Sequence, residues 1–234
     1  MSIANVDHAE VAKFDAMAAR WWDPEGAFKP LHRINPLRLD YVESRTRLRD
    51  ANLVDVGCGG GILAEGMAAR GARVIGIDLA EAALSVARMH MIETGLRVDY
   101  RCIAAEDHAR AAPGAADAVT CMELLEHVPD PAALIAACAR MVRPGGDLFF
   151  STLNRTPKSW LFAIVGAEYV MRMLPKGTHD YARFIRPSEL ALWLRQADLE
   201  LRDIRGIAFN PLRDRFSLSD DVGVNYLVHA VRPA

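Results

Sequence analysis

The sequence lacks long apolar runs and any strong excess of charge. No stretch is long and apolar enough to span a bilayer, and residues 1–14 lack the basic start and apolar run of a secretory signal. The formal net charge of -2 does not support a nucleic-acid partner. These features predict a cytoplasmic protein that binds no nucleic acid.

The sequence also lacks the paired cysteine spacing of a zinc site. Its four cysteines are Cys58, Cys102, Cys121 and Cys138. Three of them stand in apolar, strand-like or helical context, so buried, reduced thiols are expected. Function has to be sought in other residues.

Alternation of short apolar runs with helical patterns begins at about Asn52. This alternation is typical of βαβ units and a mostly parallel sheet. We expect a single doubly wound, Rossmann-like α/β domain over residues 1–234. Its parts would be a helical cover (1–50), a cofactor-binding core (51–153), a lid-like insertion (154–186) and a C-terminal helix with edge strands (187–234).

The pattern predicts seven strands, with an antiparallel edge. They are Asn52–Val56, Arg73–Ile77, Val98–Ile103, Ala116–Met122, Asp147–Thr152, Glu200–Gly206 and Asn225–Val231. Helices are expected at Val6–Trp22, Asn35–Arg49, Ile62–Arg70, Glu81–Thr94, Pro131–Met141 and Pro187–Gln196. A loop punctuated by prolines is expected over Asp23–Pro36.

A glycine-rich turn, Gly57–Gly61, follows the first predicted strand and opens the next helix. Glycines there allow a ligand to approach the backbone, and Asp78 ends the second strand, where a carboxylate can accept hydrogen bonds from ribose hydroxyls. The glycines alone also fit a tight turn without a ligand. Together with Asp78, they indicate a nucleotide-like cofactor.

The spacing of the glycines separates two cofactor classes. A nicotinamide dinucleotide site has G-x-G-x-x-G, whereas Gly57 and Gly59 begin a G-x-G-G-G run here. Asp55, just before the glycines, would repel a pyrophosphate but suits a ligand with an amine and a sulfonium. The run resembles the first motif of class I methyltransferases, which use S-adenosylmethionine (SAM).

An acidic turn follows the fourth predicted strand, where ligands bind in open α/β sheets. Glu123, Glu126 and His127 would converge on one helical turn and could hold a divalent metal. The carboxylates equally fit a solvated helix start, and His127 an ordinary hydrogen-bonded histidine. Met122 would pack either on the cofactor or in the core.

The chain resembles the ubiquinone-biosynthesis O-methyltransferases of bacteria and mitochondria almost from end to end. The matching motifs are Asn5–His8, Arg20–Asp23, Phe28–His32, Asn35–Arg38, Ser151–Arg155, Val165–Tyr169 and Pro175–Asp180. The resemblance implies a SAM-dependent enzyme that methylates hydroxyls of polyprenyl catechols or phenols in two steps. It also implies membership of a ubiquinone-biosynthesis complex.

Residue roles follow from the same resemblance. Arg38, Gly57, Asp78 and Met122 would contact SAM, with Arg38 facing the methionine carboxylate. The acidic turn would bind Mg²⁺ or another divalent ion, as in the mitochondrial relatives, and would supply the catalytic residues Glu123, Glu126 and His127. Without a metal, either His127 would act as the general base or the phenolate would react unassisted.

Residues 159–181 contain many apolar side chains. The basic residues in and around this segment outnumber the acidic ones, with Arg155, Lys158, Arg172, Lys176, Arg183 and Arg186 against Glu168 and Asp180. Such a segment suits the interface of an anionic membrane, on its inner face, and equally suits a lid or a dimer contact. The aromatic residues Trp21, Trp22 and Phe28 would line the ring site or pack the N-terminal cover. Rival functions are methylation of another small phenolic or lipid acceptor, a non-catalytic SAM-binding protein and, less favoured, a nicotinamide oxidoreductase.

Overall fold

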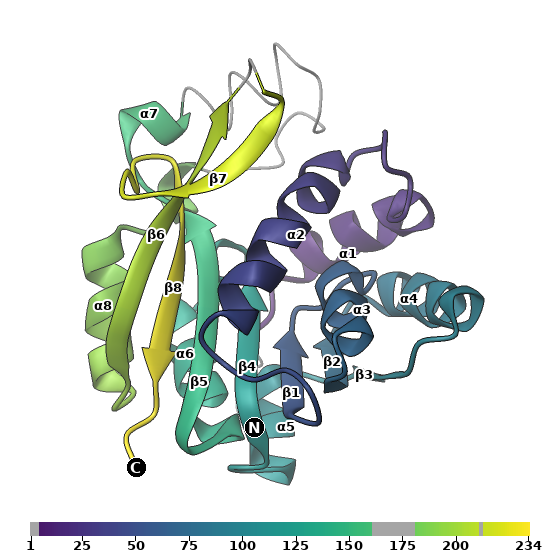
Figure 1. The fold of residues 1–234 in the computed structure, drawn as a ribbon, viewed down its shortest axis with the longest axis horizontal. Coiled ribbons are helices and arrows are strands. Elements are labelled where there is room, and N and C mark those ends of the chain that lie inside the picture. Colours follow the sequence, from purple (N-terminus) through teal and green to yellow (C-terminus); the bar gives the residue numbers. More distant parts are fainter. Residues whose placement is uncertain (1–4, 161–180, 211–212) are drawn as a thin grey trace.

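The computed structural model describes residues 5–160, 181–210 and 213–234. Within them, helices cover both faces of one sheet (Figure 1). The strands are β1 (Asn52–Val56), β2 (Arg73–Asp78), β3 (Val98–Cys102), β4 (Ala116–Met122), β5 (Val142–Leu153), β6 (Glu200–Asn210), β7 (Arg215–Ser219) and β8 (Asn225–Val231).

The sheet has the order β3-β2-β1-β4-β5-β8-β6-β7. Strands β1 to β5 are parallel, β8 is antiparallel to both β5 and β6, and β7 is antiparallel to β6. The predicted doubly wound sheet and its antiparallel edge are confirmed. The described sheet has eight strands and not seven, because β7 pairs with an extended β6.

The helices are α1 (His8–Met17), α2 (Lys29–Glu43), α3 (Ile62–Ala69), α4 (Glu81–Thr94), α5 (Ala105–Ala111), α6 (Pro131–Met141), α7 (Pro157–Ser159) and α8 (Pro187–Gln196). Short 3-10 helices are η1 (Ala18–Arg20), η2 (Leu125–His127) and η4 (Tyr181–Arg183). Helices α5, α6 and α8 pack on one face of the sheet, and α2, α3 and α4 on the other. Helix α1 lies against α4.

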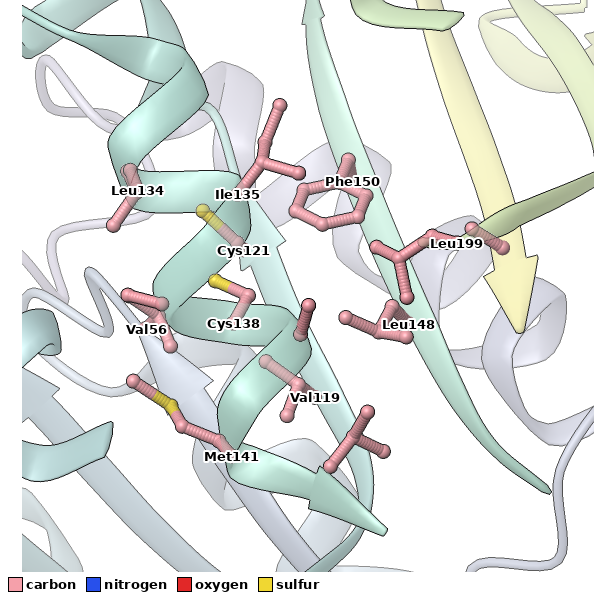
Figure 2. Close-up of a cluster of buried hydrophobic side chains, with 14 of the residues drawn as sticks. Val56, Val119, Cys121, Leu134, Ile135, Cys138, Met141, Leu148, Phe150 and Leu199 are labelled. Carbon is pink, nitrogen blue, oxygen red and sulfur yellow. The ribbon is translucent and has the colours of Figure 1, made fainter. Parts of the chain in front are cut away.

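The core follows the two-residue period of the strands. On β5, Leu148 and Phe150 point to the face covered by α6, and Phe149 points to the opposite face. Figure 2 shows Ile135 and Cys138 of α6 among the side chains packed with Leu148 and Phe150. Apolar packing on both faces therefore fixes the strands whose ends carry the site.

Three cysteines are buried and Cys102 is exposed, and all four are free. The expected burial is therefore wrong for Cys102, which lies on the edge strand β3.

The N-terminal helices differ from their predicted bounds. The helix expected over Val6–Trp22 is α1 followed by η1, and α2 begins at Lys29, inside the predicted loop. Pro30 lies in the first turn of α2, where its missing N–H costs nothing, and Pro36 is tolerated inside the helix. This earlier start is what places Arg38 in the middle of a helix.

Two predicted segments lie only partly within the described residues. The predicted membrane segment 159–181 lies largely outside the described residues, as does much of the insertion 154–186. Among the helices that the structure describes, none has the length and apolar character to cross a membrane. The four-part division of the chain stays a prediction.

Candidate active site

A cavity opens at the carboxyl ends of β1, β2 and β4. Strand β1 lies between β2 and β4, so the chain winds in opposite directions from it, and such a switch point is where open α/β sheets bind ligands. Residues of the N-terminal cover contribute part of the cavity's lining. Its polar and glycine lining includes Asn5, Asp7, Glu10, Arg38, Asp55, Gly57, Gly59, Asp78, Glu106, Glu123 and His127.

The glycine turn lines the cavity through Gly57 and Gly59. Gly57 and Gly59 have φ angles of +72° and +51°, which favour glycine. Trp21 of the cover packs directly on this turn, and a Cβ atom on Gly59 would approach its ring to 2.2 Å. Glycine is therefore needed both for the backbone conformation and for contact with the cover.

Asp78 ties the glycine turn to the end of β2. Its carboxylate accepts hydrogen bonds from the backbone N–H groups of Gly59 at 2.8 Å, Leu79 at 2.7 Å and Ala80 at 2.9 Å. Burial raises the pKa of Asp78, and these donors oppose the rise. A carboxylate offers about four acceptor positions. Asp78 therefore keeps capacity for a ribose hydroxyl.

Asp55 lies at the inner wall of the cavity, in β1. It is buried and accepts a hydrogen bond from the Thr120 hydroxyl at 2.7 Å. Burial raises the pKa of Asp55 to about 7, while the Thr120 hydrogen bond and the charge of Arg38 act in the opposite direction. A cationic ligand in the cavity would favour the ionised carboxylate.

Arg38 reaches the cavity from α2 and is only 4% exposed. Its guanidinium donates to Glu123 at 2.8 Å, and Glu123 also accepts from the Ser151 hydroxyl at 2.9 Å. The Nε atom of Arg38 is buried without a hydrogen-bond partner among the described residues. A buried donor without a partner is costly, so this geometry fits a ligand carboxylate.

The acidic turn does not form the predicted metal site. Glu123 faces Arg38 and Ser151, Glu126 accepts from the Thr152 hydroxyl at 2.8 Å, and the Nδ1 atom of His127 lies 2.7 Å from Glu10. Among the described residues, no three His, Cys, Asp or Glu side chains are grouped to hold a metal ion. Glu126 and His127 lie in the short 3-10 helix η2 and Glu123 precedes it, so the three side chains do not share one helical turn.

Glu126 also departs from its predicted place. It is buried and is not among the residues that line the cavity. Burial, and next the charge of Glu123, raise the pKa of Glu126 to about 8. A carboxyl group in this position supports the strand end at Thr152 and does not face a ligand.

The structure brings the other predicted residues together. Arg38, Asp55, Gly57, Gly59, Asp78, Met122, Glu123 and His127 all line the one cavity. Sequence reasoning missed Glu10, whose partner His127 lies 117 positions away. The available signal was the helical spacing of Glu10 and Phe14, which places both on one face of α1.

Comparison with known proteins defines the class first. A family model described as a methyltransferase domain matches residues 14–204. The magnesium protoporphyrin IX methyltransferase of Synechocystis, solved with bound SAM, has the same fold, with a TM-score of 0.65 and 17% identity over 99% of this chain and 100% of that chain. The chain belongs to the methyltransferase family that the family model describes.

Two relatives narrow the class further. Proteins named ubiquinone biosynthesis O-methyltransferase from Hahella chejuensis and Pseudomonas aeruginosa are 62% and 57% identical to the chain. Each alignment covers 99% of the chain, and 97% and 100% of the relatives respectively. The chain belongs to the family of ubiquinone biosynthesis O-methyltransferases.

Proposed function

We propose that the enzyme transfers the methyl group of SAM to hydroxyls of polyprenyl catechol or phenol intermediates, in two O-methylation steps of ubiquinone biosynthesis. The names of the relatives support the pathway. The observation that carries the proposal is the cavity itself, where groups suited to SAM and a histidine suited to proton transfer line one space.

The cavity residues fit the chemical groups of SAM. Asp78 would accept a ribose hydroxyl, the Nε atom of Arg38 would donate to the methionine carboxylate, and Asp55 would offset the positive charge of the ligand. Met122 would contact the apolar part of the cofactor. When bound, SAM supplies an electrophilic methyl group.

Methyl transfer requires an ionised or ionising acceptor oxygen. A phenol has a pKa of about 10 and is mostly protonated at neutral pH, so a base is needed. His127 lines the cavity and is the base in this proposal. In this proposal His127 removes the proton, and the other cavity residues align the methyl donor SAM with the phenolic acceptor.

A divalent ion, implied by the mitochondrial relatives, does not fit the arrangement of Glu123, Glu126 and His127. The proposed reaction therefore uses His127 and no metal ion. Assays with and without a chelator test this point. Activity that is lost with the chelator and regained with Mg²⁺ would show that these side chains rearrange to bind the ion.

Membrane association is a further part of the proposal and rests on the sequence of residues 159–181. A polyprenyl substrate resides in the bilayer. The apolar composition of this segment, together with the basic residues in and around it, suits an anionic surface. The enzyme would associate peripherally with the membrane and with other ubiquinone-biosynthesis proteins. Sedimentation with phosphatidylglycerol vesicles, but not neutral ones, would support this; equal sedimentation with both would contradict it.

A comparison of acceptors tests the function. The purified enzyme is incubated with SAM and either a short-tailed polyprenyl catechol, the same catechol without its tail, or a simple monophenol. We expect methylation with the highest kcat/KM for the tailed catechol. A preference for an untailed phenol would favour another small acceptor, and SAM binding without methylation of any of them would favour a binding protein.

A further inference from the structure

The first helix of the N-terminal cover, α1, contacts the acidic turn through a short hydrogen bond. The Oε2 atom of Glu10, in the first turn of α1, lies 2.7 Å from Nδ1 of His127. Both side chains line the cavity. A residue of the cover thus contacts the residue that would take the acceptor proton.

Phe14 makes a second contact with the imidazole of His127. Its ring meets that of His127 edge to face, with centroids 5.2 Å apart and planes at 86°. Phe14 lies one helical turn after Glu10, so α1 presents a carboxylate and an aromatic ring to the same histidine. Together they restrict both the tilt and the rotation of the ring.

We propose that Glu10 is a positioning residue that holds His127 in the tautomer required to accept the phenolic proton. An ionised carboxylate only accepts hydrogen bonds, so in the neutral imidazole the proton resides on Nδ1. The lone pair is then on Nε2. The inference rests on the proposed function, since it assigns His127 the role of base.

The proposed methyl transfer moves one proton and one methyl group. The hydroxyl proton of the acceptor passes to Nε2 of His127, the oxygen forms a bond to the SAM methyl carbon, and the carbon–sulfur bond breaks. Its electron pair stays on sulfur, which gives neutral S-adenosylhomocysteine. His127 later returns the proton to water. Glu10 forms no bond in this sequence and stabilises the imidazolium that forms.

The attachment of α1 makes this contact conditional. No residue of α1 is buried, and polar contacts help to hold the helix: Asp15 accepts from the backbone N–H of Ala82 at 3.0 Å, and Asp7 pairs with Arg183 at 2.9 Å. Displacement of α1 would remove Glu10 from His127. The base is therefore positioned only when the cover is in place.

Kinetics of Glu10 variants test the proposal in the full-length enzyme. Glu10→Gln should lower kcat about 100-fold, the lower end of the range for loss of acid–base assistance. SAM affinity by calorimetry should change by less than about 2-fold. Glu10→Asp, which keeps the carboxylate, should recover part of the rate. The matched control is Asp15→Asn, which likewise replaces a carboxylate of α1 by an amide but does not touch His127. It should change kcat by less than about 2-fold.

A spectroscopic measurement distinguishes the two proposals. In protein labelled with ¹⁵N-histidine, with the His127 signals assigned through His127→Gln, the wild type should show a protonated Nδ1 and Glu10→Gln a shift toward the other tautomer. Identical spectra, unchanged kcat in Glu10→Gln, or equal losses in Glu10→Gln and Asp15→Asn would overturn the inference. If the wild type methylates no catechol, the proposed function fails and the spectra still decide the role of Glu10.

Discussion

Asp78 has two roles. Its carboxylate accepts a hydrogen bond from the Gly59 N–H of the glycine turn, and in the proposed site it also accepts one from a ribose hydroxyl. Replacement by alanine should weaken SAM binding by about 1.5 to 3 kcal/mol, the scale for losing charge-assisted hydrogen bonds. Isothermal calorimetry measures this directly. Asp99→Ala, on the neighbouring strand β3 and outside the cavity lining, is the control and should bind SAM like the wild type. Unchanged affinity of Asp78→Ala would remove this residue from the site.

Asp55 should link SAM binding to pH. Burial raises its pKa to about 7 in the free protein, and a bound cation lowers it. The free protein then holds more protons near neutral pH, so binding releases protons and affinity rises as pH increases through about 7. Calorimetry in buffers of different ionisation enthalpy reports the number released. Asp55→Asn should abolish the release, and an equal release in this variant would contradict the assignment.

The residues of the site were predictable to different extents. Gly57 and Asp78 follow from their places at strand ends, since the chemistry of such positions is general. Arg38 was found only through family resemblance, because nothing in its local sequence marks it as a ligand. Glu10 was not found at all. Its role depends on a contact with His127 that no local pattern records.

Helices and strands with clear apolar spacing were predicted well. The bounds of α4, α6, β1 and β4 agree with the sequence pattern, since each has clear apolar spacing or end signals. Helix α5 was missed because Ala105–Ala111 is short and rich in charge. Strand β7 was missed because pairing with β6, and not its own pattern, makes it extended.

Helix α1 should respond locally to loss of its cap. Asp7 accepts from the backbone N–H of Ala9 at 3.1 Å and pairs with Arg183. Asp7→Ala should destabilise the helix by about 0.5 to 2 kcal/mol and speed its amide exchange. Hydrogen exchange with mass spectrometry of residues 8–17 measures this, with peptides from β4 as an internal control. Asp7→Asn, which keeps a capping side chain, should lie between. Equal exchange in all three proteins would refute the capping role.

At the scale of the whole molecule, the sheet topology places the site. The βαβ pattern predicted the parallel core and hence the edge at which ligands bind, and this edge is where β1, β2 and β4 end. The metal site was predicted from spacing on an ideal helical turn. In the structure, η2 is a short 3-10 helix over Leu125–His127 that Glu123 precedes. The three side chains reach separate partners and do not converge as predicted.

The packed core should carry stability independently of the site. Phe150 is fully buried on β5, in the cluster of Figure 2. Phe150→Ala should lower the free energy of unfolding by about 3 to 5 kcal/mol, through lost burial and a cavity. Urea unfolding measures it. Leu192→Ala, at a side chain 45% exposed, should stay within about 0.5 kcal/mol of the wild type. A small effect of Phe150→Ala would show that this part of the core is loosely packed.

Transfer of an isotope tests the central claim most directly. The enzyme is incubated with SAM that carries a trideuterated methyl group and with a short-tailed polyprenyl catechol, and the product is analysed by mass spectrometry and NMR. We predict one trideuteromethyl group per turnover, attached to a ring oxygen, with formation of S-adenosylhomocysteine. His127→Ala should abolish the transfer while retaining SAM binding. Label on a carbon atom, or full transfer by His127→Ala, would contradict the account.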